Sequence, residues 1–324
     1  AGALGQIGPG ASVSVRALTK LLKSDHRKQT NVALEALGEM GHAARPVVSE
    51  LLPFLASPHV DTANAAAEAL GRIGPASKEM LEQLEDMLEH QDSSLRQYAA
   101  KAIGDLGADA AHVVPKLIEL VEDPHRDVRE AAIRALGKVK VGTEEAIPVL
   151  TDSLSDRAWT VRQEILWTLG EIGTESEQAK RGLVMGLSDD RGKVRQSALD
   201  ALAKCRSIPP QSFEPLISCL NDKHPSIQKG AGRLLAMHAS DSKTYLSELT
   251  LLLNDQDEQT RCAAAETLGQ MGVFSEEAVP ALISRIDDPH PKTRSAVQKS
   301  LGQIGPRVEH YLPDLLEVLS DGSP

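Results

Sequence analysis

The sequence predicts an all-α fold, an α-solenoid built as a superhelix of antiparallel helix pairs. Three observations support this prediction. The chain of 324 residues repeats with a period of 33, each period holds two segments with helical periodicity, and 41% of the residues are hydrophobic but only 2% aromatic. Self-similarity at a fixed period of this size is typical of repeat proteins. A core of Ala, Leu, Val and Ile suits thin helices that approach one another closely.

The period of 33 holds without slippage, most clearly in two adjacent columns. The first column is aliphatic and comprises Leu4, Leu37, Leu70, Ile103, Leu136, Leu169, Leu202, Leu235, Leu268 and Leu301. The second is mostly glycine and comprises Gly5, Gly38, Gly71, Gly104, Gly137, Gly170, Ala203, Ala236, Gly269 and Gly302. We expect the leucines of the first column, such as Leu136, Leu169 and Leu268, to be buried.

The first segment of each period predicts an amphipathic helix, which we call helix A. Apolar residues recur there at i and i+4, as in Leu117 with Val121 and Leu150 with Leu154. Prolines stand near its start, where a missing N–H does least harm. These prolines are Pro115, Pro148, Pro280 and Pro313.

The second segment predicts a further amphipathic helix, helix B. At about 100° per residue, the apolar side of one copy comprises Val128, Ala132, Ala135, Leu136 and Val139. Glu130 and Arg134 point away from that side. A later glycine stands where a left-handed C-cap residue is favoured; these glycines are Gly41, Gly74, Gly107, Gly173, Gly272 and Gly305.

A single helix pair of this size cannot bury its own apolar faces, so neighbouring pairs must stack. We therefore expect one solenoid over residues 1–324, with about nine repeats and a partial repeat at each end. Residues 203–241 are the least regular: Ala203 and Ala236 replace the column glycine, and Gly230 and Gly232 lie inside a helix. Either decay without function or a bend or hinge at 203–241 accounts for this irregularity.

The line from Asp123 to Val139, D-P-x-x-x-V-R-x-A-A-x-x-A-L-G, resembles a HEAT repeat of the short type found in phycobiliprotein-lyase-like subunits. Ankyrin repeats share the period, but their T-P-L-H-x-A signature is absent. The resemblance covers essentially the whole chain and implies the solenoid fold, with helix B lining the concave face. It implies no particular activity, because the family supplies scaffolds to unrelated processes.

The resemblance also implies a ladder of Asp and Arg side chains between neighbouring repeats. Asp123 and Arg129 recur as Asp156 with Arg162, Asp189 with Arg195, Asp255 with Arg261, and Asp288 with Arg294. A half-buried charge needs partners, so we interpret these residues as structural.

Composition bounds the function. A formal charge of −11 argues against a protein whose main task is binding nucleic acid, since that task needs clustered Lys and Arg. The sequence has no apolar run long enough to span a bilayer, so we expect no membrane insertion. Three cysteines, Cys205, Cys219 and Cys262, form neither a disulfide framework nor a zinc motif. They mildly favour a reducing compartment, and we expect the cytoplasm.

The sequence contains no catalytic constellation, and we predict no enzyme activity, no metal and no cofactor. Five histidines share one column just before helix B, where a turn or capping role is expected: His26, His59, His125, His224 and His290. Deoxyhypusine hydroxylase, a relative of the short HEAT type, holds di-iron through His-Glu dipeptides at the start of helix B. This chain has no His-Glu dipeptide, and Arg129 precedes Glu130 at the matching place.

The outermost column of helix B is the candidate binding surface. It comprises Glu35, Glu68, Lys101, Arg134, Trp167, Asp200, Arg233, Glu266 and Lys299. At about 100° per residue, Trp167 points away from the core position, and we expect it to face solvent. An exposed Trp with Arg neighbours has the composition of an interface hot spot, although packing against a neighbouring side chain is the alternative. The predicted partner-binding residues are Trp167, Trp159, Arg134, Lys101, Tyr98 and Arg233.

We therefore predict a non-enzymatic scaffold that binds a protein or peptide along its concave helix-B face. An accessory subunit of a tetrapyrrole (bilin) lyase or a similar maturation enzyme is the alternative, suggested only by the resemblance. Regulation of an enzyme on the same longer chain is a third. The chain starts inside a helix B without Met and ends after a lone helix A, so we expect a segment of a longer chain or complex.

Overall fold

The computed structural model describes residues 11–74 and 78–305, together with 310, 311, 313 and 316. Within those residues the chain is α-helical and 3₁₀-helical, with no β-strand, which confirms the predicted all-α solenoid. The predicted partial repeats at the two ends fall largely outside the described residues. The chain forms two compact units, Ala1–Gly173 (unit 1) and Thr174–Pro324 (unit 2), and the predicted irregular stretch 203–241 lies within unit 2.

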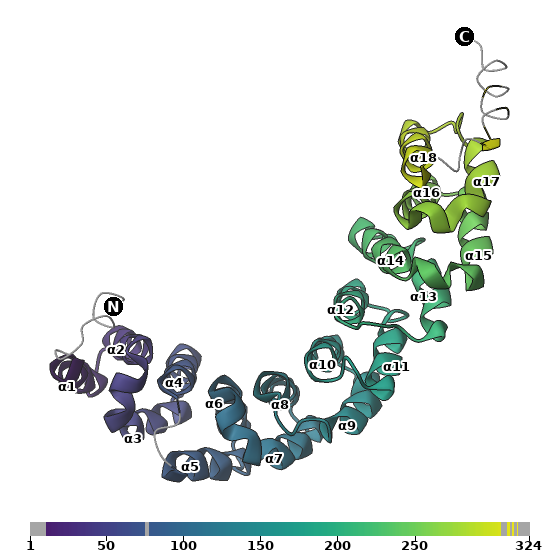
Figure 1. Cartoon of the computed structure of the whole chain (residues 1–324). Helices are drawn as coiled ribbons and strands as arrows, with labels where there is room; N and C mark the ends of the chain where they lie inside the picture. Colours follow the sequence, from purple (N-terminus) through teal and green to yellow (C-terminus); the bar gives the residue numbers. More distant parts are fainter. Residues whose placement is uncertain (1–10, 75–77, 306–309, 312, 314–315, 317–324) are drawn as a thin grey trace. The chain divides into compact units, whose positions relative to one another are not determined.

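Each unit has two layers of helices, with the B helices in one layer and the A helices in the other (Figure 1). The B helices of unit 1 are α2 (Arg27–Glu39), α4 (Val60–Ile73), α6 (Ser93–Leu106), α8 (Arg126–Val139) and α10 (Trp159–Ile172). Those of unit 2 are α12 (Gly192–Leu202), α14 (Pro225–Met237), α16 (Glu258–Met271) and α18 (Pro291–Ile304).

The A helices are shorter, and most are flanked by 3₁₀ turns. In unit 1 they are α1 (Ala11–Leu22), α3 (Val48–Leu51), α5 (Lys78–Leu88), α7 (Val114–Glu119) and α9 (Ala146–Asp152). In unit 2 they are α11 (Glu177–Gly186), α13 (Phe213–Cys219), α15 (Leu246–Leu251) and α17 (Val279–Ile283). Pro115 and Pro280 occupy the first turn of their helices as predicted.

The core lies between the two layers and is aliphatic. Leu136, Leu169 and Leu268 have no exposed surface, as predicted. One stacked aromatic pair, Phe213 with Tyr245, adds to it in unit 2 at a centroid distance of 4.5 Å. The Tyr245 hydroxyl donates a hydrogen bond to the carbonyl of Leu235 at 2.8 Å, so this buried polar group is satisfied.

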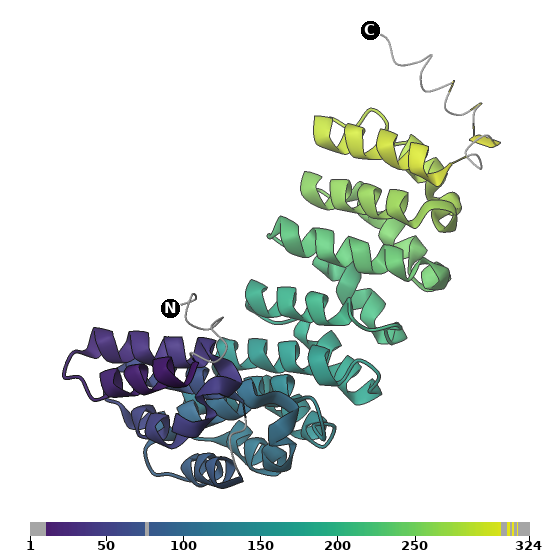
Figure 2. The same cartoon turned by 60° about the vertical axis from the view of Figure 1, so that its left-hand side comes forward.

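The glycine column sets how closely successive B helices stack. A Cβ on Gly104 would lie 2.8 Å from Cα of Ala135 in the next B helix, and one on Gly269 would lie 2.8 Å from Cα of Ser300. Neither distance leaves room for a methyl group, so glycine permits backbone-to-backbone contact here. Figure 2 shows the resulting stack of α14, α16 and α18 in unit 2.

The later glycine ends helix B in a positive-φ conformation in five of the six predicted places: Gly41, Gly74, Gly107, Gly272 and Gly305. The prediction is wrong for Gly173, which has φ −118°. In the α8 repeat the equivalent position is Lys140, with φ 62°. An L-residue other than glycine is strained there, because its Cβ crowds the backbone.

The implied ladder of Asp and Arg is present, and Arg129, Arg195 and Arg261 each reach forward to an Asp of the next repeat. Arg129 Nε donates to Asp156 Oδ2 at 2.7 Å, and its Nη1 donates to the carbonyl of Asp123 at 2.9 Å. Arg261 binds Asp288 through Nε and Nη2, at 2.8 and 3.1 Å. These side chains are almost fully buried, so each rung is a bidentate, desolvated ion pair.

Two further residues belong to the ladder, although the repeated Asp–Arg pattern did not reveal them. Arg96 binds Asp123 at 2.8 Å, and Asp222 accepts from Arg195 at 2.6 Å. Gln228 stands at the Arg position of its repeat and keeps only the carbonyl bond, to Asp222 O at 2.8 Å. In the irregular stretch, the residue at the Arg position therefore keeps the bond within its own repeat but not the ion pair with the next one.

Candidate functional site

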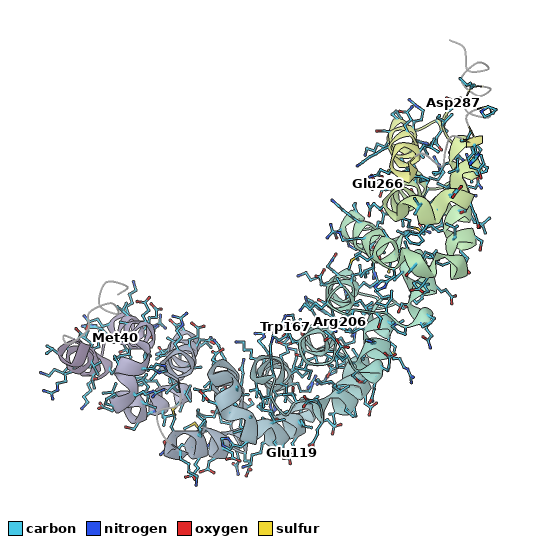
Figure 3. All side chains as sticks on the ribbon, viewed as in Figure 1. Met40, Glu119, Trp167, Arg206, Glu266 and Asp287 are labelled. Atoms are coloured by element: carbon cyan, nitrogen blue, oxygen red, sulfur yellow. The ribbon has the colours of Figure 1, made fainter. Side chains whose placement is uncertain are left out.

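The outermost column of the B helices lies at the surface in both units. Seven of its members are exposed: Glu35, Glu68, Arg134, Asp200, Arg233, Glu266 and Lys299. Lys101 and Trp167 are half-buried. Figure 3 shows Trp167 and Glu266 on the B-helix layer of their respective units. We call the surface around this column the B-helix face of each unit.

Trp167 does not project freely into solvent, which corrects the expectation from the helical wheel. Its ring lies on the preceding B helix, where a Cβ on Gly137 would be 2.6 Å from Cζ3 of the indole. The neighbouring Thr168 hydroxyl donates to the carbonyl of Ile133 at 2.9 Å. Gly137 of the glycine column therefore leaves space for the indole ring of Trp167. Part of that ring packs between α10 and α8.

Tyr98 requires a larger correction. It is only 5% exposed, so it lies in the core of unit 1 rather than on the B-helix face where a partner would touch it. Burial raises the pKa of its hydroxyl. Trp159, the first residue of α10, is half-buried. Arg233 is exposed but belongs to unit 2.

The cations Lys101, Arg134 and Lys138 on the B-helix face of unit 1 are each paired with an acidic residue. Lys101 Nζ donates to Asn64 Oδ1 at 2.8 Å and to Glu68 Oε1 at 3.1 Å. Arg134 binds Glu164, with Nε 3.1 Å from Oε2, and this hydrogen bond raises the pKa of Arg134.

Lys138 pairs with Asp105 in the same way. Lys101, Arg134 and Lys138 together border a hollow of about 130 Å³ between α6 and α8, so the structure does bring Lys101 and Arg134 together. Each of the three already has an acceptor within the chain, and a ligand would have to compete with it.

The B-helix face of unit 2 has a larger hollow, about 370 Å³, along α14 and α16 with a contribution from α18. We call it the unit 2 groove. Its floor contains small side chains, namely Gly232, Ala263 and Cys262. Its other lining residues are Pro225, Gln228, Lys229, Glu258, Gln259, Glu266, Thr267, Gln270 and Lys292.

Glycine is required at one point of this floor. A Cβ on Gly232 would lie 2.4 Å from the Thr267 hydroxyl oxygen. The three preceding repeats carry large apolar residues at the same position: Ile133, Leu166 and Leu199. Gly232 thus lets α14 and α16 approach each other, and this explains one of the irregular glycines of the 203–241 stretch.

Among the residues that the structure describes, the cations around the unit 2 groove have no carboxylate partner. Lys229 and Arg233 lie on α14, Lys292 and Lys299 lie on α18, and none of these side chains makes an ion pair with any residue that the structure describes. Neither α14 nor α18 contains an Asp or Glu. The intervening Glu258 pairs with His290 at 3.1 Å, which leaves Glu266 as the exposed carboxylate of the groove.

One substitution explains why the same register gives a pair in one unit and none in the other. Glu68 and Lys101 are 33 residues apart and bond, whereas Glu266 and Lys299 have the same spacing and make no such bond among the described residues. Lys101 has a second acceptor in Asn64, and the equivalent residue for Lys299 is Cys262. A thiol is a weak acceptor, so it cannot help to hold the ammonium group.

The three cysteines are free thiols, of which Cys205 and Cys219 are buried and Cys262 is half-buried. Burial raises the pKa of Cys219 to about 11, and it also raises the pKa values of Cys205 and Cys262, so these thiols are poorly ionised. The described part of the chain contains no cluster of His, Cys, Asp and Glu that could hold a metal ion. It also contains no helix long and apolar enough to cross a membrane.

The histidine column has a structural role, as expected. His26, His59, His125, His224 and His290 are the N-cap residues of their helices, without a capping bond from the ring. Instead, the rings of two of them lie against ladder arginines. Arg96 Nη2 is 3.2 Å from His125 Nδ1, and Arg261 Nη2 is 2.9 Å from His290 Nδ1.

Comparison with protein-family models identifies the repeat. HEAT repeats match at residues 15–104, 48–121, 81–170, 114–203, 213–302 and 246–324. The chain belongs to the HEAT-repeat family. A model of the PBS lyase HEAT-like repeat also matches, at residues 194–222 alone, which agrees with the short HEAT type inferred from the sequence. No curated protein matches the chain.

Solved structures share the HEAT fold with this chain at low sequence identity. An engineered protein has 22% identity and a TM-score of 0.52, with 95% of this chain and 93% of that one covered. YibA of E. coli has 16% identity and a TM-score of 0.56, with coverage of 92% and 97%. Kap121p bound to Nup53p has 14% identity and a TM-score of 0.74, with coverage of 95% and 39%. These similarities establish the fold, which suits a protein-interaction scaffold.

Proposed function

We propose that this HEAT-repeat chain is a non-catalytic scaffold that binds a protein or a peptide through its B-helix face. The observation that carries the proposal is the unit 2 groove, a hollow of about 370 Å³ whose rim lysines, Lys229 and Lys292, make no ion pair among the described residues. Exposed charged side chains without an ion pair among the described residues are available to a partner. Kap121p, which has the same fold, is bound to Nup53p in its structure, and this supports a binding role.

The contact residues predicted from the sequence differ in how freely they can reach a partner. Arg233 lies next to Lys229 on the same face of α14 and remains a contact residue. Lys101 and Arg134 can contribute only by exchanging their present acceptors. Trp167 and Trp159 offer the exposed part of their rings.

The match to the PBS lyase HEAT-like repeat covers one repeat and supports the repeat type only. We therefore do not extend the proposal to a tetrapyrrole lyase subunit. The chain is expected to act without a cofactor of its own, and its partner is a protein or peptide rather than nucleic acid.

The proposal is tested by panning a library of random displayed peptides on the full chain. The recovered peptides are then assayed against two double variants with the same change of net charge. Glu35→Lys with Glu266→Lys alters the B-helix face, and Glu119→Lys with Glu248→Lys alters the A helices α7 and α15; all four residues are exposed. Figure 3 shows Glu119 on the A-helix layer of unit 1.

Binding should change markedly for the B-helix double variant and should stay unchanged for the A-helix one. The recovery of no peptide, or of peptides that respond to the A-helix variant instead, would refute the proposed function.

A further inference from the structure

The unit 2 groove has the dimensions of a site for an extended peptide. Along α16, its lining runs from Glu258 to Gln270, a distance of about 18 Å at a helical rise of about 1.5 Å per residue. An extended chain covers about 3.3 Å per residue, so about five peptide residues fit along it. The small side chains of Gly232 and Ala263 let a main chain lie close to the helices.

The polar groups along α16 match a peptide main chain. Gln259 and Gln270 are exposed and make no hydrogen bond through their side chains among the residues that the structure describes. A side-chain amide offers both donors and an acceptor, as a peptide group does. Glu266 offers an acceptor for a main-chain N–H of the ligand.

The cations at the rim determine which peptides the groove accepts. Lys229 lies on one wall and Lys292 on another, and Arg233 and Lys299 continue the same faces of α14 and α18. These four positive charges have no ion-pair partner among the described residues, although the chain as a whole carries −11. An unpaired local excess of cations within an acidic protein favours a negatively charged ligand.

Resting on the proposed function, we infer that the unit 2 groove binds an acidic, extended peptide segment of a partner protein. Lys229 and Lys292 bind its carboxylates from the two sides, and Arg233 and Lys299 extend the field beyond the groove. Gln259, Gln270 and Glu266 bind its main chain. Nucleic acid is disfavoured because its backbone carries a charge at every phosphate and would meet Glu258 and Glu266 within the groove, whereas a peptide presents its neutral main chain to them.

The inference separates the two units, because the lysines of the corresponding face in unit 1 are held internally. Lys138 and Lys140, at the end of α8, pair with Asp105 and Glu171. Their loss should therefore cost a little stability and no peptide affinity. These two lysines give a control that changes net charge by the same amount as a substitution at the unit 2 groove.

The test uses fluorescence anisotropy with the full chain and three synthetic mixtures of short labelled peptides, which are rich in Glu, rich in Lys or uncharged. The Glu-rich mixture should bind best. Lys229→Glu with Arg233→Glu should lower its affinity about tenfold or more, because like charges then face each other. Lys138→Glu with Lys140→Glu should leave the affinity nearly unchanged, and circular dichroism confirms that both variants are folded.

Several outcomes would overturn the inference. One is preferential binding of the Lys-rich or uncharged mixture, and another is an equal loss of affinity in both double variants. Tighter binding of single-stranded oligo(dT), lost in the unit 2 variant, would make the groove a nucleic-acid site instead. If peptides recovered by panning bind the B-helix face of unit 1, the proposed function stands while this inference fails. If no peptide binds anywhere, both fail.

Discussion

The two units use the same B-helix surface in opposite ways. In unit 1, Lys101 bonds to Asn64 and Glu68, so this charged side chain forms contacts between neighbouring repeats. In unit 2, Lys299 stands at the same register, the residue equivalent to Asn64 is Cys262, and Lys299 makes no ion pair among the described residues. A single column position thus decides whether a charged face holds the stack together or remains open to a partner.

The interiors of the two units are alike, and the strongest test of that statement concerns the ladder. Arg129 in unit 1 and Arg261 in unit 2 each make a bidentate pair with the next repeat. Replacement of either Arg with Ala leaves a desolvated carboxylate behind and should cost about 3 kcal/mol of stability. Urea unfolding of both variants should show similar losses. A much smaller loss for Arg261→Ala would mean that the units differ inside as well as outside.

The ladder also predicts a dependence on pH. The hydrogen bond from Arg261 holds the pKa of Asp288 below its usual value. Because the folded pKa is then lower than the unfolded one, the stabilisation is fully present above about pH 3.9 and is lost as pH falls through the folded pKa.

Asp288→Asn should therefore be less stable than the wild type near neutral pH, and the difference should shrink below about pH 4. The comparison is made by urea unfolding at a series of pH values. A difference that stays constant in acid would show that the charge of Asp288 has no part in the rung.

The glycine column should give the next largest effect, again equal in the two units. Gly104→Ala and Gly269→Ala place a Cβ within 2.8 Å of a backbone Cα and should each destabilise the chain by about 1–3 kcal/mol. Gly302 belongs to the same column, but a Cβ there would meet no described atom within 4 Å. Gly302→Ala should therefore stabilise by about 1 kcal/mol through helix propensity. Thermal unfolding of the three variants distinguishes close packing from propensity.

A smaller effect is expected at the end of α8, within unit 1. Lys140 has φ 62° where the preceding repeat has Gly107 with φ 63°. Lys140→Gly should stabilise the chain by about 1 kcal/mol by relieving strain. The net gain is reduced by the small contribution of the lost ion pair between Lys140 and Glu171. Gly107→Lys should destabilise by a similar amount, since a Cβ there meets only the carbonyl of Lys138 at 3.9 Å. Changes of opposite sign in the thermal unfolding temperature of the two variants would confirm that Lys140 is strained by its positive φ. Changes of the same sign would contradict this.

The fold was predictable because every repeat has the same pattern of apolar and polar residues. The period of 33, the two helices per repeat and the buried Leu136, Leu169 and Leu268 all follow from patterns that lie within one or two turns of helix. The ladder was implied by family resemblance, but Arg96 escaped notice because His90 stands where its own repeat would carry Asp.

The candidate site was predictable only in part. A helical wheel places Trp167 on the outside of its own helix, but it contains no information about the next helix, where Gly137 receives the ring. Tyr98 is buried for the same reason: the neighbouring helices cover it. The unit 2 groove arises from small residues on two helices and from the replacement of Asn64 by Cys262 in the column, and such effects appear only once the helices are stacked.

The most direct test of the difference between the two faces is the rate at which individual lysines react with trace acetic anhydride, measured by mass spectrometry on the intact chain. Lys101 is half-buried and its Nζ is held by Asn64 and Glu68, whereas Lys299 is exposed and makes no ion pair among the described residues. The reagent therefore reaches Lys299 more easily, and Lys299 should be acetylated several-fold faster than Lys101. Cys262→Asn should lower the acetylation rate of Lys299, and Asn64→Cys should raise the acetylation rate of Lys101. Equal rates for the two lysines in the wild type, with no response to either substitution, would contradict the account.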